Sequence, residues 1–161
     1  MKKEQTVDYT IKVAWHAISR MYNQYGTDFD ITSATGYVLL NIDVDKGTPA
    51  TKIAPMLGME SRSLTRMLKT MEMEKKWIYR EKDPSDGRSV RIMLTELGKK
   101  KREISRLSVR EFNRRIAEQL SPEELENFFK VSAVICQVAD DRNQINEFLD
   151  YVNSRKENET I

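Results

Sequence analysis

The hexapeptide DPSDGR at residues 83–88 contains two carboxylates and a guanidinium. Such a stretch could form a calcium loop, a catalytic carboxylate pair or a tight turn. A calcium loop of the EF-hand type needs oxygen ligands at alternate positions and a glutamate at its end, and neither is present. A catalytic carboxylate pair would leave Asp83 and Asp86 without a histidine partner, at a predicted hairpin tip that excludes water poorly. A tight turn favours Asp, Pro, Ser and Gly, each for its own reason. The turn is the best interpretation, and it leaves Arg88 to be explained.

The sequence offers few residues for metal or nucleophilic chemistry. Cys136 and His16 are its only cysteine and histidine, which excludes an internal disulfide framework and every cysteine-rich or histidine-rich metal site. It contains no Gly-rich phosphate loop and no nucleophile elbow. We therefore predict that the protein is not an enzyme and uses no metal and no cofactor. Cys136 lies in an apolar helical segment and is expected to be buried; a thiol-based redox sensor acting through Cys136 is an alternative.

Positive charge is concentrated in the middle of the chain. The net charge is +2, yet residues 61–102 contain 13 Lys and Arg against 6 Asp and Glu. Residues 61–75 have one apolar helical face, formed by Leu64, Met67, Leu68 and Met71. The opposite face fits the major groove of DNA, because Arg can read guanine edges while Lys and Thr hold phosphates. The DNA-binding residues predicted here are Ser61, Arg62, Ser63, Thr65, Arg66 and Lys69.

Two helices and a hairpin are predicted to position this face. Residues 50–57 and 61–75 have the pattern of two short helices joined through Gly58, and Pro55 keeps the first of them short or kinked. Residues 77–82 and 89–94 alternate apolar and polar side chains, as half-buried strands do. The order helix, helix, hairpin predicts a winged helix-turn-helix with DPSDGR at the tip of the wing.

Longer helices are predicted on both sides of this lobe. Residues 5–26 carry a narrow apolar stripe that would pack against other helices, formed by Val7, Ile11, Ala14, Ile18, Met21 and Tyr25. Thr32 or Ser33 is expected to cap the next helix. After a helix over 96–120, SPEE (121–124) predicts a capping box, and the helical pattern continues to about residue 153.

These segments resemble the MarR-type winged-helix regulators, over nearly the whole chain. The resemblance rests on four motifs: Ser63-Leu64-Thr65-Arg66, Asp83-Pro84, Asp86-Gly87-Arg88, and Leu94-Thr95 with Gly98. It implies that Asp86 pairs with Arg88 and that Arg88 reaches the DNA minor groove, whose negative potential attracts arginine. Ser85 and Gly87 belong to the same predicted wing contact.

The recognition helix departs from the family pattern at its end. Members usually close this helix with a glycine, whereas MEMEKKWIYR (71–80) has no glycine and apparently one extra residue. The helix must therefore end through Lys75 or Lys76 in a less favourable cap, or continue further. This leaves the angle between the helix and the wing open.

The expected fold is mainly α with a small β-hairpin wing. We expect an N-terminal dimerisation helix (1–30), a winged helix-turn-helix DNA-binding lobe (31–98), C-terminal dimerisation helices (99–155) and a disordered tail (156–161). The resemblance implies an intertwined homodimer whose two recognition helices meet a near-palindromic double-stranded operator with half-sites about 34–36 Å apart. It also implies that a small-molecule effector releases the protein from DNA by binding in a pocket that Trp15, Tyr22 and Tyr37 could border.

The predicted function is that of a sequence-specific DNA-binding transcriptional regulator, acting as a repressor. A winged-helix module used only for contact with other proteins is the second alternative. No apolar run approaches the ~18 residues that span a bilayer, so no membrane partner is expected. The N-terminus has no apolar signal core, which predicts a cytoplasmic location.

Overall fold

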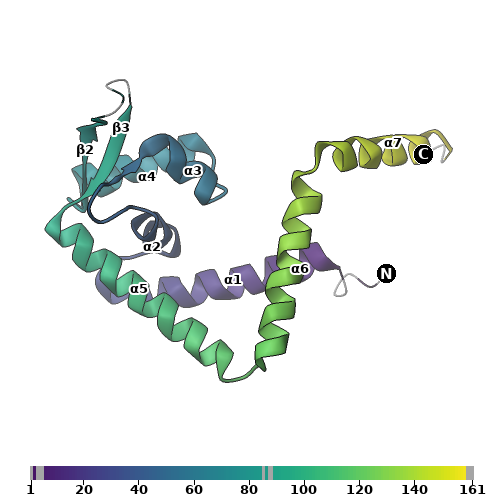
Figure 1. The fold of residues 1–161 in the computed structure, drawn as a ribbon, viewed down its shortest axis with the longest axis horizontal. Helices are drawn as coiled ribbons and strands as arrows, with labels where there is room; N and C mark the ends of the chain where they lie inside the picture. Colours follow the sequence, from purple (N-terminus) through teal and green to yellow (C-terminus); the bar gives the residue numbers. More distant parts are fainter. Residues whose placement is uncertain (1, 3–5, 85, 87–88, 159–161) are drawn as a thin grey trace. The chain divides into compact units, whose positions relative to one another are not determined.

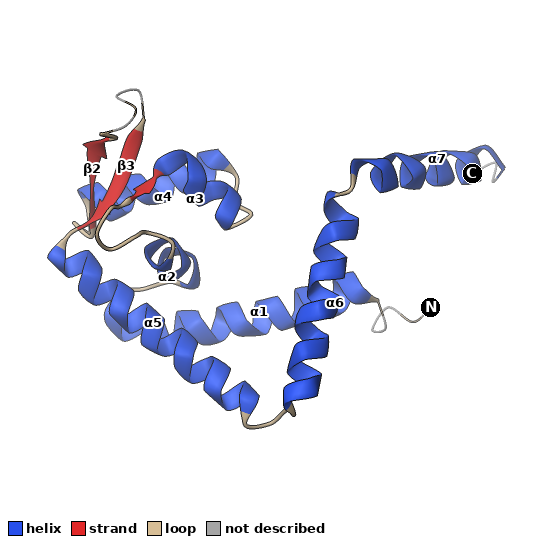
Figure 2. Ribbon diagram, viewed as in Figure 1, coloured by secondary structure: helices blue, strands red, loops and turns tan. Residues whose placement is uncertain are grey.

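The computed structural model describes residues 2, 6–84, 86 and 89–158 of the chain. They form two compact units, Met1–Glu111 and Phe112–Ile161. Helices predominate, and one small sheet lies in the first unit (Figure 1 and Figure 2), which confirms the predicted fold class. The elements in chain order are α1 (Val7–Gly26), the 3-10 helix η2 (Thr27–Phe29), α2 (Ser33–Leu40), β1 (Thr48–Pro49), α3 (Ala50–Met56), α4 (Ser61–Met73), β2 (Ile78–Lys82), β3 (Val90–Leu94), α5 (Glu96–Ala117), α6 (Pro122–Asp140) and α7 (Arg142–Asn158).

A tight connection joins α1 to α2. Gly26 ends α1 as predicted, and a Cβ at this position would lie 1.9 Å from the carbonyl oxygen of Ile31. The amide of Ile31 donates to the Gly26 carbonyl at 2.9 Å. Thr32 caps α2: its hydroxyl accepts from the Thr35 amide at 3.1 Å, and the Thr35 hydroxyl accepts from the Thr32 amide at 2.9 Å. Of the two predicted caps, the structure selects Thr32.

Helices α3 and α4 form the predicted helix-turn-helix. Helix α3 is short, with Pro55 inside it, and Gly58 takes a left-handed conformation (φ 58°) in the turn that follows. The core of the first unit draws on α2, α3, α4 and the sheet. Its largest fully buried side chains are Trp77, Leu39, Ile42, Ile53, Met71, Ile78, Ile92 and Val38.

The sheet has three antiparallel strands in the order β1-β3-β2. The predicted hairpin is confirmed: β2 and β3 lie side by side (Figure 2), with Ile78 opposite Leu94 and Lys82 opposite Val90. Strand β1 is an addition to the prediction, because a two-residue strand is too short to show alternation. Its Pro49 lies opposite Arg91 at the edge of the sheet, where a residue without an amide hydrogen is tolerated.

Lys76 takes the place of the expected glycine after the recognition helix. The amides of Glu74 and Lys75 both donate to the Thr70 carbonyl, so the last turn of α4 widens. Lys76 then adopts a left-handed conformation with φ 56°, and the Trp77 amide donates to the Met71 carbonyl at 2.9 Å. The chain thus turns into β2 without a glycine, at the cost of a left-handed lysine.

The second unit contains the end of α5 with α6 and α7. The predicted capping box of α6 is confirmed, with the Ser121 hydroxyl accepting from the Glu124 amide at 3.2 Å. The expected continuous helical pattern is interrupted at Asp141, whose backbone is extended and whose carboxylate accepts from the Asn143 amide at 2.9 Å. Helix α7 then reaches Asn158, three residues into the segment that was expected to be disordered.

No helix in the described ranges is both long enough and apolar enough to cross a membrane. The same residues contain no group of three or more His, Cys, Asp or Glu side chains placed to hold a metal ion.

Candidate nucleic-acid interface

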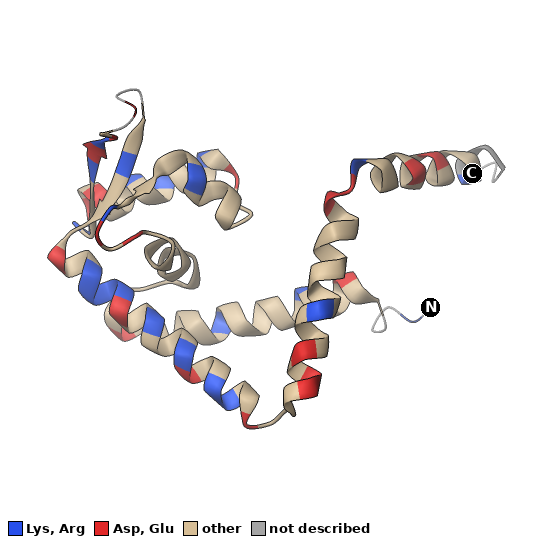
Figure 3. Cartoon of the chain, in the orientation of Figure 1, with Lys and Arg blue, Asp and Glu red and all other residues tan. Residues whose placement is uncertain are grey.

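Helix α4 has a buried face and an exposed polar face, as its sequence predicts. Leu64, Leu68 and Met71 are buried in the core, and Met67 packs partly against it. The structure brings the six predicted DNA-binding residues of this helix together on its exposed side: Ser61, Arg62, Ser63, Thr65, Arg66 and Lys69. The Thr65 hydroxyl donates to the Ser61 carbonyl at 2.8 Å, so its oxygen can still accept a hydrogen bond. Basic positions on α4 are visible in Figure 3.

The cations of the basic segment divide into two groups. Arg62, Arg66 and Lys69 have no ion-pair partner within the part of the chain that the structure describes. Several others are paired internally: Lys75 with Asp30, Arg80 with Glu72 (3.0 Å), Arg91 with Asp83 (2.8 Å) and Lys99 with Glu96 (2.7 Å). The exposed face of α4 therefore offers three cations to an external anion, beside the exposed Lys76, Lys82 and Lys100 of the same segment.

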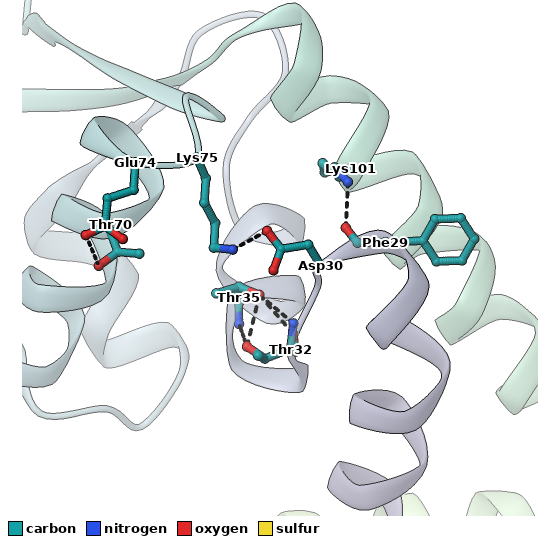
Figure 4. Close-up of polar contacts among 8 residues, drawn as sticks. All are labelled: Phe29, Asp30, Thr32, Thr35, Thr70, Glu74, Lys75 and Lys101. Carbon is teal, nitrogen blue, oxygen red and sulfur yellow. Dashed lines mark hydrogen bonds and ion pairs between the residues drawn. The ribbon is translucent and has the colours of Figure 1, made fainter.

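The C-terminal end of α4 is tied to the segment that connects α1 with α2 (Figure 4). Lys75 pairs with Asp30, whose own backbone is left-handed (φ 58°), and this hydrogen bond holds the pKa of Asp30 below its ordinary value. Lys101 donates to the Phe29 carbonyl at 2.5 Å. Both ammonium groups also lie over the Trp77 ring, at 4.9 Å and 5.5 Å from its centroid. These contacts hold the segment that follows α4, and the start of α5, against the connection between α1 and α2.

The hairpin that contains DPSDGR continues beyond the two strands. The Asp83 amide donates to the Ser89 carbonyl at 2.9 Å, and the Ser89 amide donates to the Asp86 carbonyl at 2.8 Å. Both bonds agree with the interpretation of this stretch as a turn. Ser85, Gly87 and Arg88 lie outside the described residues, so the predicted pairing of Asp86 with Arg88 stays a prediction.

Arg91 and Asp83 form an ion pair that the sequence motifs did not predict. The side chain of Asp83 is only 6% exposed and that of Arg91 is 24% exposed. A hairpin register could have revealed this pair, because Arg91 lies opposite Glu81 and is therefore diagonal to Asp83 on the same face.

The three aromatic residues predicted to border an effector pocket meet in the first unit. The rings of Trp15 and Tyr37 are 5.6 Å apart, and those of Tyr22 and Tyr37 meet edge to face at 6.2 Å. Burial, reinforced by Tyr37, raises the pKa of Tyr22 to about 12, and burial also raises the pKa of Tyr37. Trp15 and Tyr37 line a groove of about 560 Å³, a size that suits a small molecule. Its other lining residues are Ser19, Asn23, Thr32, Ser33, Ala34, Met56, Leu57 and Met59.

Cys136 is exposed on α6, and the expectation that it is buried is wrong for the single chain. The apolar residues beside it in the sequence are also largely exposed: Val134 is 53% and Val138 is 48% accessible. Apolar composition predicts burial only where another element covers the helix, and within the described part of the second unit Val134, Cys136 and Val138 are left exposed.

Comparisons with known proteins agree with this geometry. A sequence model of the MarR family matches residues 31–90. The transcriptional regulator SarZ of Staphylococcus aureus is 36% identical over 98 residues, which is 60% of this chain and 65% of SarZ. The chain thus spans less than two thirds of that relative's length.

Solved structures extend the likeness beyond residues 31–90. The structure of S. aureus MepR bound to DNA superimposes with a TM-score of 0.76 at 27% identity, over 84% of this chain and 99% of MepR. The transcriptional repressor CouR, bound to a 23-mer DNA duplex, superimposes with a TM-score of 0.70 at 25% identity, over 83% of this chain and 94% of CouR. Residues 31–90 therefore match the MarR family model, and the chain shares the winged helix-turn-helix fold of these relatives.

Proposed function

We propose that this protein is a sequence-specific DNA-binding transcriptional regulator that acts as a homodimeric repressor. The observation that carries the proposal is the exposed face of α4, where Arg62, Arg66 and Lys69 have no internal partner in the described structure. A face that only kept the protein soluble would not need to concentrate unpaired cations on the second helix of a helix-turn-helix. In the proposed complex α4 lies in the major groove, and no catalytic step is involved.

The dimer would form through the terminal helices, where large apolar side chains are exposed on the single chain. On α1 these include Val7 (55%), Ile11 (46%) and Tyr25 (61%). On α6 and α7 they include Phe128, Phe129, Val131, Val134, Val138, Ile145, Phe148 and Leu149. Apolar surface on this scale marks an interaction site, and a second copy of the chain would cover it. Residues 1–30 and 99–155 are accordingly proposed as the dimerisation segments.

The wing would contribute a minor-groove contact through Ser85, Asp86, Gly87 and Arg88. We expect Arg88→Ala to weaken DNA binding with little change in the unfolding transition, because a residue at a hairpin tip adds little to the core. The check is an affinity titration at fixed salt beside a thermal melt of the same variant. An unchanged affinity would remove Arg88 from the interface.

A small-molecule effector is part of the proposal, and the groove beside Trp15 and Tyr37 is its proposed site. Three residues that line the groove, Met56, Leu57 and Met59, belong to α3 and the turn before α4. A molecule bound in the groove would therefore contact the DNA-binding lobe directly. SarZ comes from Staphylococcus aureus, a bacterium, and in a bacterial host a DNA-binding regulator would act in the cytoplasm.

The experiment that tests the function begins with a random pool of duplexes. The protein selects from it, and the selected duplex is titrated beside an unrelated one of equal length. The proposal predicts a near-palindromic selected site that binds about 10³-fold or more above the control duplex, with two protomers per site. Equal and weak binding of both duplexes would overturn it and favour a winged-helix module that contacts another protein.

A further inference from the structure

Arg91 is a cation of the basic segment whose guanidinium is turned inward. It lies on β3, the central strand, opposite Pro49 of β1 and Glu81 of β2. Its Nε donates to Asp83 Oδ2 at 2.8 Å. Its Nη1 donates to the carbonyl oxygens of Lys46 at 2.7 Å and of Gly47 at 3.3 Å. One side chain thus connects the end of β2 to the loop that precedes β1.

These bonds join two segments that the backbone alone would hold weakly. Strand β1 has only two residues, and beyond Lys82 the backbone bond from the Asp83 amide to the Ser89 carbonyl extends the pairing of the two hairpin arms by one step. Gly47 is left-handed (φ 62°), and a Cβ there would lie 2.7 Å from the carbonyl oxygen of Ile92, so the loop packs closely against β3. The Arg91 guanidinium lies between this loop and Asp83 and makes charge-assisted hydrogen bonds to both.

We propose that Arg91 is a positioning residue, which fixes the root of the wing for DNA binding rather than contacting DNA itself. The inference rests on the proposed DNA-binding function. A wing that is already held in place loses less conformational entropy when it binds DNA, so it binds more tightly. This advantage is lost when the root of the wing is free to move. Asp83 serves the same purpose, although its negative charge on a DNA-binding lobe would by itself repel phosphate.

The salt dependence of affinity distinguishes a positioning role from a direct phosphate contact, because each phosphate contact releases a counterion from the DNA. A phosphate-contacting cation adds about 0.9 to the slope of log affinity against log salt, and its removal lowers the slope by that amount per contact. A positioning residue changes the affinity and leaves the slope as it was. Lysine at position 91 keeps the charge but cannot offer both Nε and Nη1 in the same fork.

The test titrates the selected duplex against salt with wild type, Arg91→Met, Arg91→Lys and Asp83→Asn, each checked for native far-UV circular dichroism. We expect Arg91→Met to bind about tenfold and Arg91→Lys about threefold more weakly, with wild-type salt slopes. Asp83→Asn makes the protein more positive, yet we expect it too to bind more weakly. The double variant Arg91→Met/Asp83→Asn should lose little beyond the larger single loss, because both changes break the same contact. Lys69→Met, on the exposed face of α4, is the control that should lower the slope.

Each alternative gives a different pattern. Wild-type affinity in Arg91→Lys with a reduced slope in Arg91→Met would make Arg91 a phosphate contact and overturn the inference. Tighter binding by Asp83→Asn, or wild-type binding by all three variants, would overturn it as well. If Arg91→Met fails to fold, Arg91→Lys and Asp83→Asn still decide. Failure of the wild type itself to prefer the selected duplex would overturn the proposed function, and the inference with it.

Discussion

Replacing Lys76 with glycine should stabilise this protein. The residue has φ 56°, a conformation that costs a side chain with a Cβ roughly 1–2 kcal/mol and glycine almost nothing. Glycine loses more chain entropy on folding, which offsets about 0.5–1 kcal/mol of that gain. The net expectation for Lys76→Gly is a free energy of unfolding about 0.5–1 kcal/mol higher and a melting temperature roughly 2 °C higher. The carbonyl of residue 76, which accepts from the Thr95 hydroxyl at 2.8 Å, is unaffected.

Two control variants isolate the backbone effect. Lys76→Ala removes the same charge and keeps a Cβ, so its stability should stay within about 0.5 kcal/mol of wild type. Glu74→Gly places glycine two residues earlier, where φ is −97° and the backbone is right-handed, and should destabilise by about 1 kcal/mol. Urea unfolding at one fixed protomer concentration measures all four proteins, since dimerisation contributes to the apparent stability. A Lys76→Gly variant no more stable than Lys76→Ala would refute the reasoning.

Two further predictions concern the first unit. Because the pKa of Tyr22 is raised by burial from 10.0 to about 12, the folded state favours the neutral phenol, so its contribution to stability is complete below pH 10 and declines as the pH rises toward 12. The late tyrosinate absorbance of the near-UV titration should be smaller by one phenol in Tyr22→Phe than in wild type, and Tyr37, whose pKa burial also raises, should supply what remains. An unchanged late absorbance in Tyr22→Phe would contradict the assignment. Ile11→Glu should raise the dimer dissociation constant about 100-fold or more, because it places an unpaired charge in an apolar contact. Sedimentation velocity measures this, with the exposed neighbour Lys12→Glu as the control, and equal dimerisation of both variants would exclude α1 from the interface.

Local patterns in the sequence were enough to predict the recognition lobe. The two faces of α4 follow from helical spacing, and the hairpin follows from alternation around a stretch rich in turn residues. The cap at Thr32 and the capping box at Ser121 are likewise local, since each is made by residues three apart. The same kind of signal was available for the break before α7, because Asp141 is a good N-cap residue, but the apolar pattern continuing past it concealed the break.

Tertiary features were not accessible from such patterns. Lys75 and Arg91 counted as free positive charge in the sequence, and only the fold brings them to Asp30 and Asp83. The left-handed conformation of Lys76 replaces a glycine signal with a residue that carries no turn signal at all. The exposure of Cys136 depends on what covers α6, which composition does not specify.

The central claim is that the exposed face of α4 binds DNA, and the most direct measurement is the salt dependence of affinity for the selected duplex. Wild type is compared with a variant carrying Arg62→Ala, Arg66→Ala and Lys69→Ala, and with a charge-matched variant carrying Lys12→Ala, Lys130→Ala and Arg142→Ala at exposed positions elsewhere. The account predicts a steep negative slope for wild type and the matched variant, and a slope shallower by about 2 to 5 for the α4 variant, because a dimer loses up to six contacts. Equal slopes and equal affinities in all three proteins would contradict it.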